Sequence, residues 1–376
     1  MPRLSFPIFL IISCPGCNSM ADEIDLFLCV NSAYLKFASV TLISASSKLR
    51  SGSRIRAHVL SMKPVPETMR QALQDSVPDA QISFIDASSA HLGKLTADFE
   101  KRSGIALTPT WLRGFISELF PTLECAIYLD CDLSVMGDLA VLEETDLQGF
   151  PIGAVKDPGI ASWRRGRPSK SERRQYKSRD EYLIKTVGLA DPAAYFNAGV
   201  LLFSPRMLHD EGFLGKAISW LSENPSLRYL DQDLLNHFFW NRCKSLDPRW
   251  NVLMGFTLEN PAALGDPQFS EYFKSLRDPW CCHYAGSFKP WLGDDEEYAL
   301  PWTQHVMQSR FCWQLEALRH QNELEMIEGS LRSSAMLKLS LSAKREIFKL
   351  LAAVGVRRKE FAERSRRLKK ILAHLK

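Results

Sequence analysis

The segment DEIDLFLCVNSAYLKFASVTLIS, residues 22–44, decides the fold class of this 376-residue chain. Its first part places apolar side chains at Ile24, Leu26, Leu28 and Val30, an alternation that is typical of a strand with one buried face. Residues 34–44 then repeat apolar side chains at helical spacing. The segment therefore predicts a strand that leads into a helix.

The same strand–helix order repeats further along the chain. Strand candidates at 55–60 and 82–86 enclose a polar helix candidate at 66–74. A helix candidate at 110–119 ends before Pro121 and leads into a strand at 125–129. The later expectations are short strands at 153–155 and 196–203, helices at 205–221 and 230–240, irregular chain at 251–279 and an apolar segment at 280–285. This order predicts an α/β fold with a mostly parallel sheet flanked by helices.

Charge is unevenly distributed along the chain. The formal net charge is +4, yet residues 330–376 hold fourteen Lys and Arg against three Asp and Glu, a net charge of +11. The other 329 residues therefore carry −7, which argues against a basic nucleic-acid-binding body. We expect no nucleic acid among the partners.

A basic helical extension is expected at the C-terminus, over residues 301–376. From Ala335, Lys and Arg surround apolar residues that recur at steps of three, four or seven. The apolar set is Ile347, Leu350, Leu351, Val354, Phe361, Leu368, Leu372 and Leu375. Such a helix suits an anionic membrane surface, where each basic residue adds roughly 1 kcal/mol of attraction. The alternative is a solvated helix that packs on its own domain.

Residues 1–21 form an N-terminal extension with two interpretations. Arg3 and the apolar run 4–13 resemble a short export signal, although the run is roughly half of what a membrane-spanning helix requires. We expect a disordered extension or an upstream start choice instead. Cys14 and Cys17 form a C-x-x-C pair, which indicates either a redox motif or exposed thiols.

The stretch 163–179 is very basic and is expected to form a mobile surface loop. The functional alternative is a flap over a bound ligand or a contact for an anionic partner. The sequence leaves both possibilities open.

Two carboxylates follow the strand at 125–129. Ligands of open α/β sheets bind beyond the carboxyl ends of the strands, so Asp130 and Asp132 lie where chemistry is expected. At this spacing both carboxylates reach one divalent cation, while Cys131 points away. Such a cation would neutralise the charge that grows on a departing diphosphate.

His283 is the candidate third ligand, although a lone His is more often a hydrogen-bonded core or surface residue. Its neighbours favour the ligand interpretation, because the Gly286 amide could approach a phosphate and Lys289 could pair with it. A mixed set of imidazole and carboxylates suits Mn²⁺ better than Ca²⁺.

Several motifs, in this order, resemble glycosyltransferase family 8, especially its bacterial lipopolysaccharide glucosyl- and galactosyltransferases. They lie between Asp22 and Trp291. The matching pieces are Cys29–Lys36 (CVNSAYLK), Trp111–Arg113 (WLR), Ile127–Asp132 (IYLDCD), Tyr195–Leu202 (YFNAGVLL), Leu230–Asp233 (LDQD), Arg249–Asn251 (RWN) and His283–Trp291 (HYAGSFKPW).

The resemblance implies roles that can be carried over residue by residue. It implies Asp130, Asp132 and His283 as ligands of Mn²⁺ or Mg²⁺, and Gly286 and Lys289 as contacts of the pyrophosphate. The donor sugar or phosphate would contact Arg113, Asn197 and Asp231, Gln232 would lie beneath the anomeric carbon, and Tyr34 would stack on uracil.

The nucleoside-binding segment departs from the family pattern. The family usually has Asp-x-Asn-Tyr, whereas this chain has Asn31-Ser32-Ala33-Tyr34. Asn31 can still bond a uracil edge, but Ala33 cannot. The alternative is that Asn31 caps the helix that follows.

The family resemblance implies transfer with retention of configuration and leaves two routes. Either Gln232 or Asp233 forms a transient covalent sugar, or the acceptor attacks the face from which the diphosphate departs. Asp231 and Asp233 have a structural alternative, because acidic residues stabilise the first turn of a helix.

We therefore expect a GT-A, Rossmann-like catalytic domain over residues 22–300, with the helical extension behind it. The predicted enzyme uses Mn²⁺ and UDP-glucose or UDP-galactose. Its acceptor is a membrane-linked glycan such as the lipopolysaccharide core, at the cytoplasmic face of the membrane. The alternatives are a protein or soluble acceptor, or a catalytically silent membrane-tethered scaffold protein.

Overall fold

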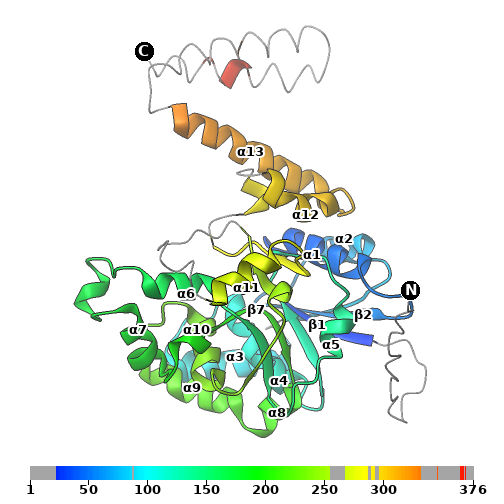
Figure 1. The fold of residues 1–376 in the computed structure, drawn as a ribbon. Helices are drawn as coiled ribbons and strands as arrows, with labels where there is room; N and C mark the ends of the chain where they lie inside the picture. The colour runs from blue at the N-terminus through cyan, green and yellow to red at the C-terminus, as the bar shows by residue number, and fades with distance from the viewer. Residues whose placement is uncertain are drawn as a thin grey trace, which may run out of the picture.

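The computed structural model describes residues 23–86, 89–254, 267–286, 289–292 and 296–331, together with 345, 365–367 and 369. Figure 1 shows a central sheet with helices on both faces. Its seven strands follow the order β3-β2-β1-β4-β7-β6-β8. They are β1 (Glu23–Val30), β2 (Arg54–Ser61), β3 (Gln81–Asp86), β4 (Ala126–Leu129), β6 (Ile152–Lys156), β7 (Phe196–Phe203) and β8 (Cys243–Ser245).

The sheet is mostly parallel, as predicted. Strands β3, β2, β1 and β4 pair in parallel, and so do β6 and β8. Strand β7 pairs antiparallel with both β4 and β6, so it runs against the other six. The carboxyl ends of β1, β4 and β6 therefore lie at one edge of the sheet, where ligands of open α/β sheets bind.

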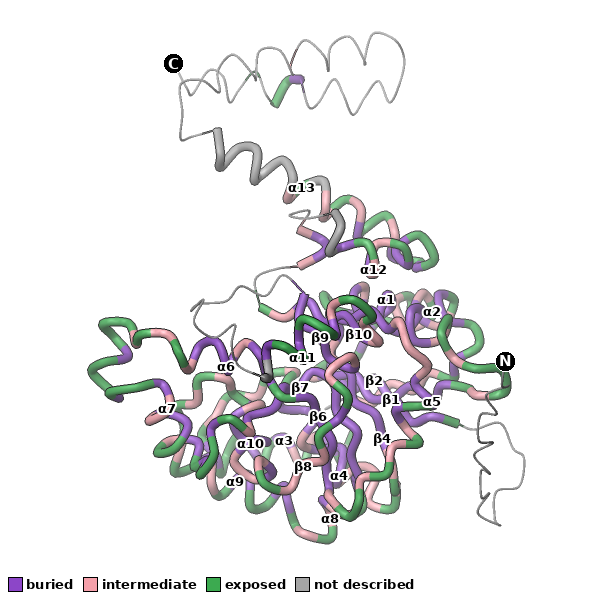
Figure 2. Tube along the Cα trace, in the orientation of Figure 1, coloured by how far each residue is buried: buried purple, intermediate pink, exposed green. Residues whose placement is uncertain are grey.

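Strand β1 is buried on both faces, because helices cover the sheet on each side. Leu26 and Leu28 join one core cluster, whereas Phe27 and Cys29 join the other. Figure 2 shows this burial running through the central strands. The first cluster lies under α1 (Leu35–Ser47), α2 (Glu67–Ser76), α5 (Leu139–Glu143), α12 (Glu296–Val306) and α13 (Cys312–Leu331). The second lies under α3 (Ala90–Ser103), η1 (Pro109–Phe115), α4 (Ile116–Leu119), α8 (Pro205–Asp210), α9 (Phe213–Glu223) and α10 (Leu230–Phe239).

A small second sheet lies next to the first, in the order β5-β10-β9. Its strands are β5 (Leu133–Val135), β9 (Val252–Leu253) and β10 (Cys281–His283). Strand β10 pairs antiparallel with β5 and parallel with β9, which joins chain segments far apart in the sequence. This pairing builds the candidate site.

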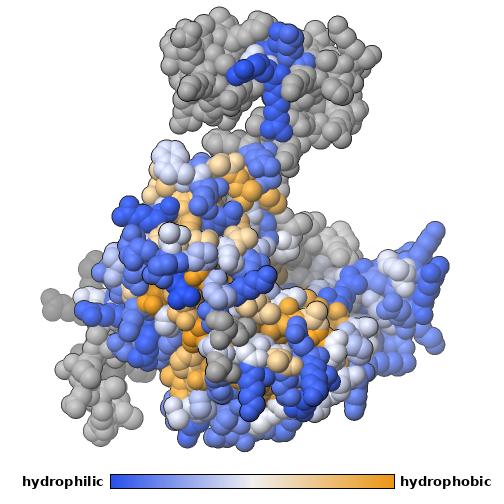
Figure 3. Space-filling view, turned by 180° about the vertical axis from the view of Figure 1, so that it is seen from behind, coloured by the Kyte–Doolittle hydropathy of each residue, from blue (hydrophilic) through white to orange (hydrophobic). Residues whose placement is uncertain are grey.

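The basic stretch at 163–179 is in part the loop that the sequence predicts, because residues 166–171 and 175–178 lie outside helices. It belongs to a helical lobe of α6 (Pro158–Arg165), η2 (Glu172–Arg174), α7 (Arg179–Tyr182) and η3 (Leu183–Val187). Trp163 and Tyr182 are buried in a small core of this lobe, and Arg179 donates a hydrogen bond to the Trp163 carbonyl at 2.7 Å. The outer side chains are hydrophilic, and the lobe projects from the body in Figure 3. Interleaved aromatic residues therefore gave the basic stretch a core.

Two more expectations are corrected. The helix expected at 205–221 is split into α8 and α9, because Gly212 adopts a left-handed backbone with φ +64° between them. The irregular chain expected at 251–279 contains β9 and α11 (Pro267–Ser275).

The expected helical extension begins within the described chain. Residue 300, the predicted boundary, lies inside α12, and α12 and α13 pack back on the body through Trp302 and Leu315. Residues 1–21 and nearly all of 335–376 lie outside the described residues. In the part of the chain that the structure describes, no helix is both long and apolar enough to cross a bilayer.

Candidate functional site

Asp130 and Asp132 lie at the carboxyl end of β4, a strand whose four residues are all buried. The Asp130 amide donates to the Gly199 carbonyl of β7 at 2.8 Å, which fixes the chain as it leaves the sheet. Cys131 between them is buried in the core, as the alternation predicts. The two carboxylates therefore project on the side of the chain opposite Cys131.

His283 meets these carboxylates through the small sheet. His283 pairs with Leu133 across β10 and β5, and the next amide, Tyr284 N–H, donates to the Asp132 carbonyl at 3.0 Å. Its Nε2 lies 3.7 Å from Asp130 Oδ2 and 3.4 Å from Asp132 Oδ1. One ligand atom from each residue lies within 4.8 Å of the others, a spacing that fits coordination of one divalent cation.

Positively charged side chains lie next to Asp130 and Asp132. Lys289 forms an ion pair with Asp132 and also donates to the Tyr284 carbonyl at 2.6 Å. Burial alone would raise the pKa of Asp132, but His283 and Lys289 outweigh it and hold that pKa well below its usual range. Asp132 is therefore a fixed negative charge at neutral pH.

Arg113 links Asp130 to α10. Its guanidinium donates to Asp130 Oδ1 at 3.0 Å, and its Nε lies 2.7 Å from Asp231 Oδ2, an ion contact without hydrogen-bond geometry. Tyr128 donates to the same Asp130 oxygen at 2.8 Å, and its ring lies 4.2 Å beneath the Arg113 guanidinium. Burial raises the pKa of Asp231 to about 6, although Arg113 opposes the shift.

Gly286 and Lys289 lie just beyond β10. Gly286 has φ +74°, a left-handed conformation that favours glycine, in the turn after the strand. Lys289 begins the described segment 289–292, next to η7 (Pro290–Leu292). The turn thus follows directly from the strand that carries His283.

A chain of buried carboxamides runs behind His283. Asn251, at the end of η5 (Pro248–Asn251), lies 2.8 Å from His283 Nδ1 and donates to Asn197 Oδ1 at 2.8 Å. Asn197 donates to Asp157 at 2.9 Å, and Gln232 donates to the same Asp157 oxygen at 3.1 Å. The structure therefore connects Asn197 and Gln232 to the cluster through Asp157 and Asn251, two residues that the sequence did not single out. Asn251 stood in the quoted RWN motif, but no pattern indicated its role.

Gln232 and Asp233 on α10 differ in their surroundings. Gln232 Oε1 accepts from the Ala198 amide at 3.0 Å. Asp233 is fully buried, and Tyr182 and Tyr195 donate to its two oxygens at 2.6 and 2.7 Å. The Tyr229 amide, at the start of the helix, donates to Asp233 at 2.8 Å. Asp233 therefore has the capping role that the sequence left open.

A pocket of about 290 Å³ opens beside the cluster. It is lined by Cys29, Asn31, Tyr34, Pro109, Thr110, Tyr128, Asp130, Cys131 and Asp132. Tyr34 is 41% exposed, and Asn31 Oδ1 accepts from the Tyr34 amide at 2.9 Å. Asn31 thus closes the turn before α1, whose N-cap is Tyr34 and not Asn31, and its side chain also lines the pocket.

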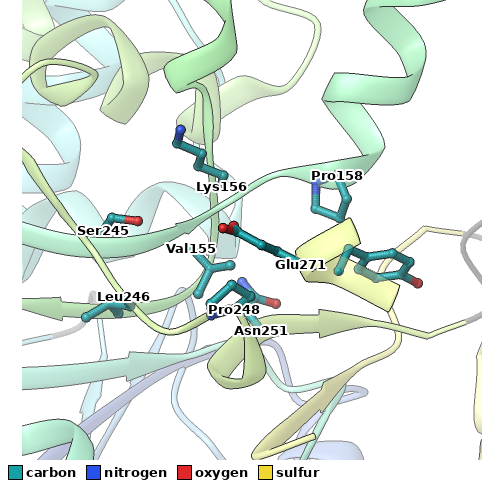
Figure 4. A pocket seen from close by; sticks show the side chains of 9 residues that line it. Val155, Lys156, Pro158, Ser245, Leu246, Pro248, Asn251 and Glu271 are labelled. Carbon is teal, nitrogen blue, oxygen red and sulfur yellow. The ribbon is translucent and has the colours of Figure 1, made fainter. Parts of the chain in front are cut away.

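A second pocket, of about 220 Å³, lies at the carboxyl ends of β6 and β8 (Figure 4). Its lining comes from Val155, Lys156, Pro158, Ser245, Leu246, Pro248, Asn251, Glu271 and Tyr272. Asn251 therefore separates this pocket from His283.

Comparison with known proteins agrees with this geometry. General stress protein A of Bacillus subtilis is 28% identical over 171 residues, 44% of this chain and 52% of that protein. Lipopolysaccharide 1,3-galactosyltransferase of Salmonella typhimurium is 25% identical over 225 residues, 57% of this chain and 58% of that protein. The chain thus spans about half the length of these relatives.

Solved structures show the same fold. The bifunctional glycosyltransferase WbbM in its apo form matches with a TM-score of 0.67 and 21% identity, over 79% of this chain and 52% of that one. The galactosyltransferase LgtC, in complex with donor and acceptor sugar analogues, matches with a TM-score of 0.59 and 24% identity, over 76% of this chain and 96% of that one. These neighbours have the GT-A fold.

The model of glycosyl transferase family 8 matches residues 25–295, a range that holds every candidate site residue and both sheets except the first two residues of β1. The chain therefore belongs to glycosyl transferase family 8.

Proposed function

We propose that this chain is a metal-dependent, retaining hexosyltransferase that moves glucose or galactose from a UDP-sugar to a glycan acceptor. The observation that carries the proposal is the meeting of Asp130, Asp132 and His283, whose ligand atoms lie within 4.8 Å of one another. Their chemistry, two carboxylates and one imidazole, suits Mn²⁺, with Mg²⁺ as the second choice. When bound, such a cation supplies the positive charge that a departing diphosphate needs.

The chain's own residues would hold the donor on both sides of this cluster. The pocket lined by Asn31 and Tyr34 is the proposed nucleoside site, where the exposed Tyr34 ring offers a face for uracil. Lys289 and the Gly286 amide are the proposed pyrophosphate contacts, because both follow β10 next to the cluster. The negative charge that develops on the departing diphosphate would thus lie next to the positive charge of Lys289.

We place the sugar near Arg113, Asn197, Asp231 and Gln232. Arg113 bridges Asp130 and Asp231, so one guanidinium connects the metal side to the sugar side. In this proposal Asn197 and Asp231 hold sugar hydroxyls, and Gln232 presents lone-pair density beneath the anomeric carbon.

Retention follows most simply by the same-face route in this arrangement. Both oxygens of Asp233 are held by tyrosine hydroxyls in the core, so this carboxylate is poorly placed to attack a sugar. Gln232 is a weak nucleophile, and its Oε1 already accepts a backbone hydrogen bond. We therefore propose that the acceptor attacks from the side of the departing diphosphate, which takes up the proton.

The proposed acceptor is a membrane-linked glycan such as the lipopolysaccharide core, reached from the cytoplasmic face. Two relatives are named as lipopolysaccharide galactosyl- and glucosyltransferases. In the proposed arrangement, residues 22–300 form the catalytic domain and the basic extension after it binds anionic lipid. Met307 and Trp313, within this extension, are 68% and 80% exposed, and Trp is enriched at membrane interfaces.

A flotation assay tests the membrane contact. The full chain should float with vesicles that contain an anionic lipid, and should stay unbound with neutral vesicles or at high salt. Flotation that is equal with neutral vesicles would contradict the electrostatic contact.

The catalytic proposal is tested by donor-dependent release of UDP. UDP-glucose, UDP-galactose and UDP-N-acetylhexosamines are compared with and without Mn²⁺. Asp132→Ala should lower turnover about 10³-fold, because charge stabilisation by a metal is worth several kcal/mol. Asp98→Asn, an exposed carboxylate on α3, serves as the control and should retain the wild-type rate. Release that is independent of metal, or no release from any donor, would refute the proposal; the second result is expected of a silent scaffold protein.

A further inference from the structure

The hydrogen bonds around the buried carboxamides behind His283 fix which end of each amide donates and which accepts. Asp157 is 5% exposed, and three donors surround it: the Ile160 amide at 2.9 Å, the Asn197 carboxamide at 2.9 Å and the Gln232 carboxamide at 3.1 Å. A carboxylate accepts hydrogen bonds and donates none. Asn197 must therefore turn its NH₂ group toward Asp157.

The opposite end of Asn197 is fixed independently. Its Oδ1 accepts from the Gly199 backbone amide at 2.9 Å, and a backbone N–H can only donate. Asn251 contacts this same oxygen at 2.8 Å and so must offer its own NH₂ group. Because both ends of Asn197 agree, Asn251 cannot be flipped without placing two acceptors against each other.

This orientation of Asn251 decides which atom faces His283. The Asn251 Oδ1 lies 2.8 Å from His283 Nδ1, and an amide oxygen requires a proton on that nitrogen. The Nδ1–H form of a neutral imidazole leaves a lone pair on Nε2. Nε2 is the atom that lies 3.4 Å from Asp132 and 3.7 Å from Asp130.

We propose that Asn251 is a positioning residue that accepts a hydrogen bond from His283 Nδ1–H, so that Nε2 is the nitrogen that would offer its lone pair to a cation held between Asp130 and Asp132. This inference rests on the proposed metal site. It adds a residue that touches neither the cation nor the sugar in that proposal. Ligating histidines in proteins commonly donate their second N–H to an acceptor that fixes ring and tautomer, and mutation of such a partner typically costs 10- to 100-fold in metal affinity.

Burial strengthens the influence of Asn251 on His283. His283 and Asn251 are 3% and 2% exposed, so water has little room to replace a lost partner. The backbone of Asn251 is also held, because η5 leads directly into β9, which pairs with β10 at His283. Asn251 is therefore held directly before the small sheet that carries His283.

The test uses two substitutions at Asn251 in the full chain. Asn251→Leu removes the acceptor and keeps the branching at Cγ, whereas Asn251→Asp keeps an acceptor for Nδ1–H, removes the donor to Asn197 and adds a negative charge. The control is Asn241→Leu, the same exchange at an exposed turn after α10. A His283→Gln variant identifies the His283 signals among the eight histidines.

The first readout is the ¹⁵N spectrum of histidine-labelled protein with UDP and saturating Mg²⁺, a diamagnetic cation that can take the Nε2 lone pair. The wild type, Asn251→Asp and Asn241→Leu should show His283 as the Nδ1–H tautomer. Asn251→Leu should show a substantial share of Nε2–H. A wild-type His283 without a proton on Nδ1, or an unchanged tautomer in Asn251→Leu, would overturn the proposal.

The second readout is the Kd for Mn²⁺ in the presence of UDP, followed by the electron paramagnetic resonance of free Mn²⁺. Asn251→Leu should weaken Mn²⁺ binding by about 10- to 100-fold, and Asn251→Asp should recover most of the loss. Equal weakening in both variants would show a merely structural role and would overturn the proposal. If the wild type binds no Mn²⁺, the metal site fails, while the presence or absence of a proton on His283 Nδ1 still decides the role of Asn251.

Discussion

Gly199→Ala is the sharpest perturbation of the candidate site. Gly199 lies in β7, and a Cβ at this position would lie 2.2 Å from Cε1 and 2.8 Å from Nδ1 of His283, and 3.0 Å from Asp130 Oδ2. Ordinary van der Waals contact begins near 3.4 Å, so the imidazole would have to retreat from 2.2 to 3.4 Å, by about 1.2 Å. The added methyl group therefore acts directly on two of the three proposed ligands.

The expected loss follows from this displacement. A misplacement of about 1 Å can lower the rate about 10²-fold, which corresponds to about 2.7 kcal/mol of transition-state stabilisation. The ring would also lose its geometry with Asn251, so the Kd for Mn²⁺ should rise by about 10-fold or more. Stability should change little from backbone entropy, because Ala in a strand is at least as favourable as Gly.

The assay compares kcat/KM for UDP release and the Kd for Mn²⁺ with those of Gly153→Ala. Gly153 lies in the neighbouring strand β6, where an added Cβ meets only the ends of Leu147 and Leu246 at 3.0 and 3.1 Å. These flexible side chains can give way, so Gly153→Ala should retain activity. A folded Gly199→Ala variant with wild-type kcat/KM and Mn²⁺ affinity would refute the assignment of His283 to the metal site.

Three further predictions address other parts of the molecule. Burial raises the pKa of Asp231 to about 6 and its charged form pairs with Arg113, so kcat/KM should rise as the pH increases through about 6. Asp231→Asn should lower the rate and remove this acidic limb of the pH–rate profile, and an unchanged limb would contradict the assignment. Burial alone would raise the pKa of Asp25, but His58 and Arg56 together lower it, so the charged carboxylate stabilises the fold above the ordinary Asp pKa and this stabilisation is lost as pH falls through the lowered value. Asp25→Asn should therefore lower the free energy of unfolding, measured with urea, by about 3 kcal/mol at pH 7 and by less in acid, without loss of UDP release. Gly215→Ala in α9, where no atom lies within 4 Å of the added Cβ, should raise the free energy of unfolding by about 0.5 to 1 kcal/mol; a lower midpoint of thermal unfolding would contradict this.

The sequence by itself determined the strands and helices that carry the site. The alternating apolar residues in 24–30 and the continuous apolar run 125–129 both predict central strands, because each pattern is a local property of the chain. The position of Asp130 and Asp132 follows equally directly, since a carboxylate at the end of a buried parallel strand must lie at the ligand-binding edge. The sequence motifs around His283 and Asn197 indicated the glycosyltransferase family.

Only the tertiary structure decided which of these residues meet and in what state. Asp132 and His283 come together because β10 pairs with β5, a long-range choice that no local pattern encodes. The basic stretch at 163–179 packs as a lobe because its own Trp163 and Tyr176 share one core with residues further along the chain, such as Tyr195. Asn251 likewise gained its role from neighbours on two distant strands, β7 and β10, because hydrogen-bond direction depends on which donors and acceptors finally face each other in a buried space.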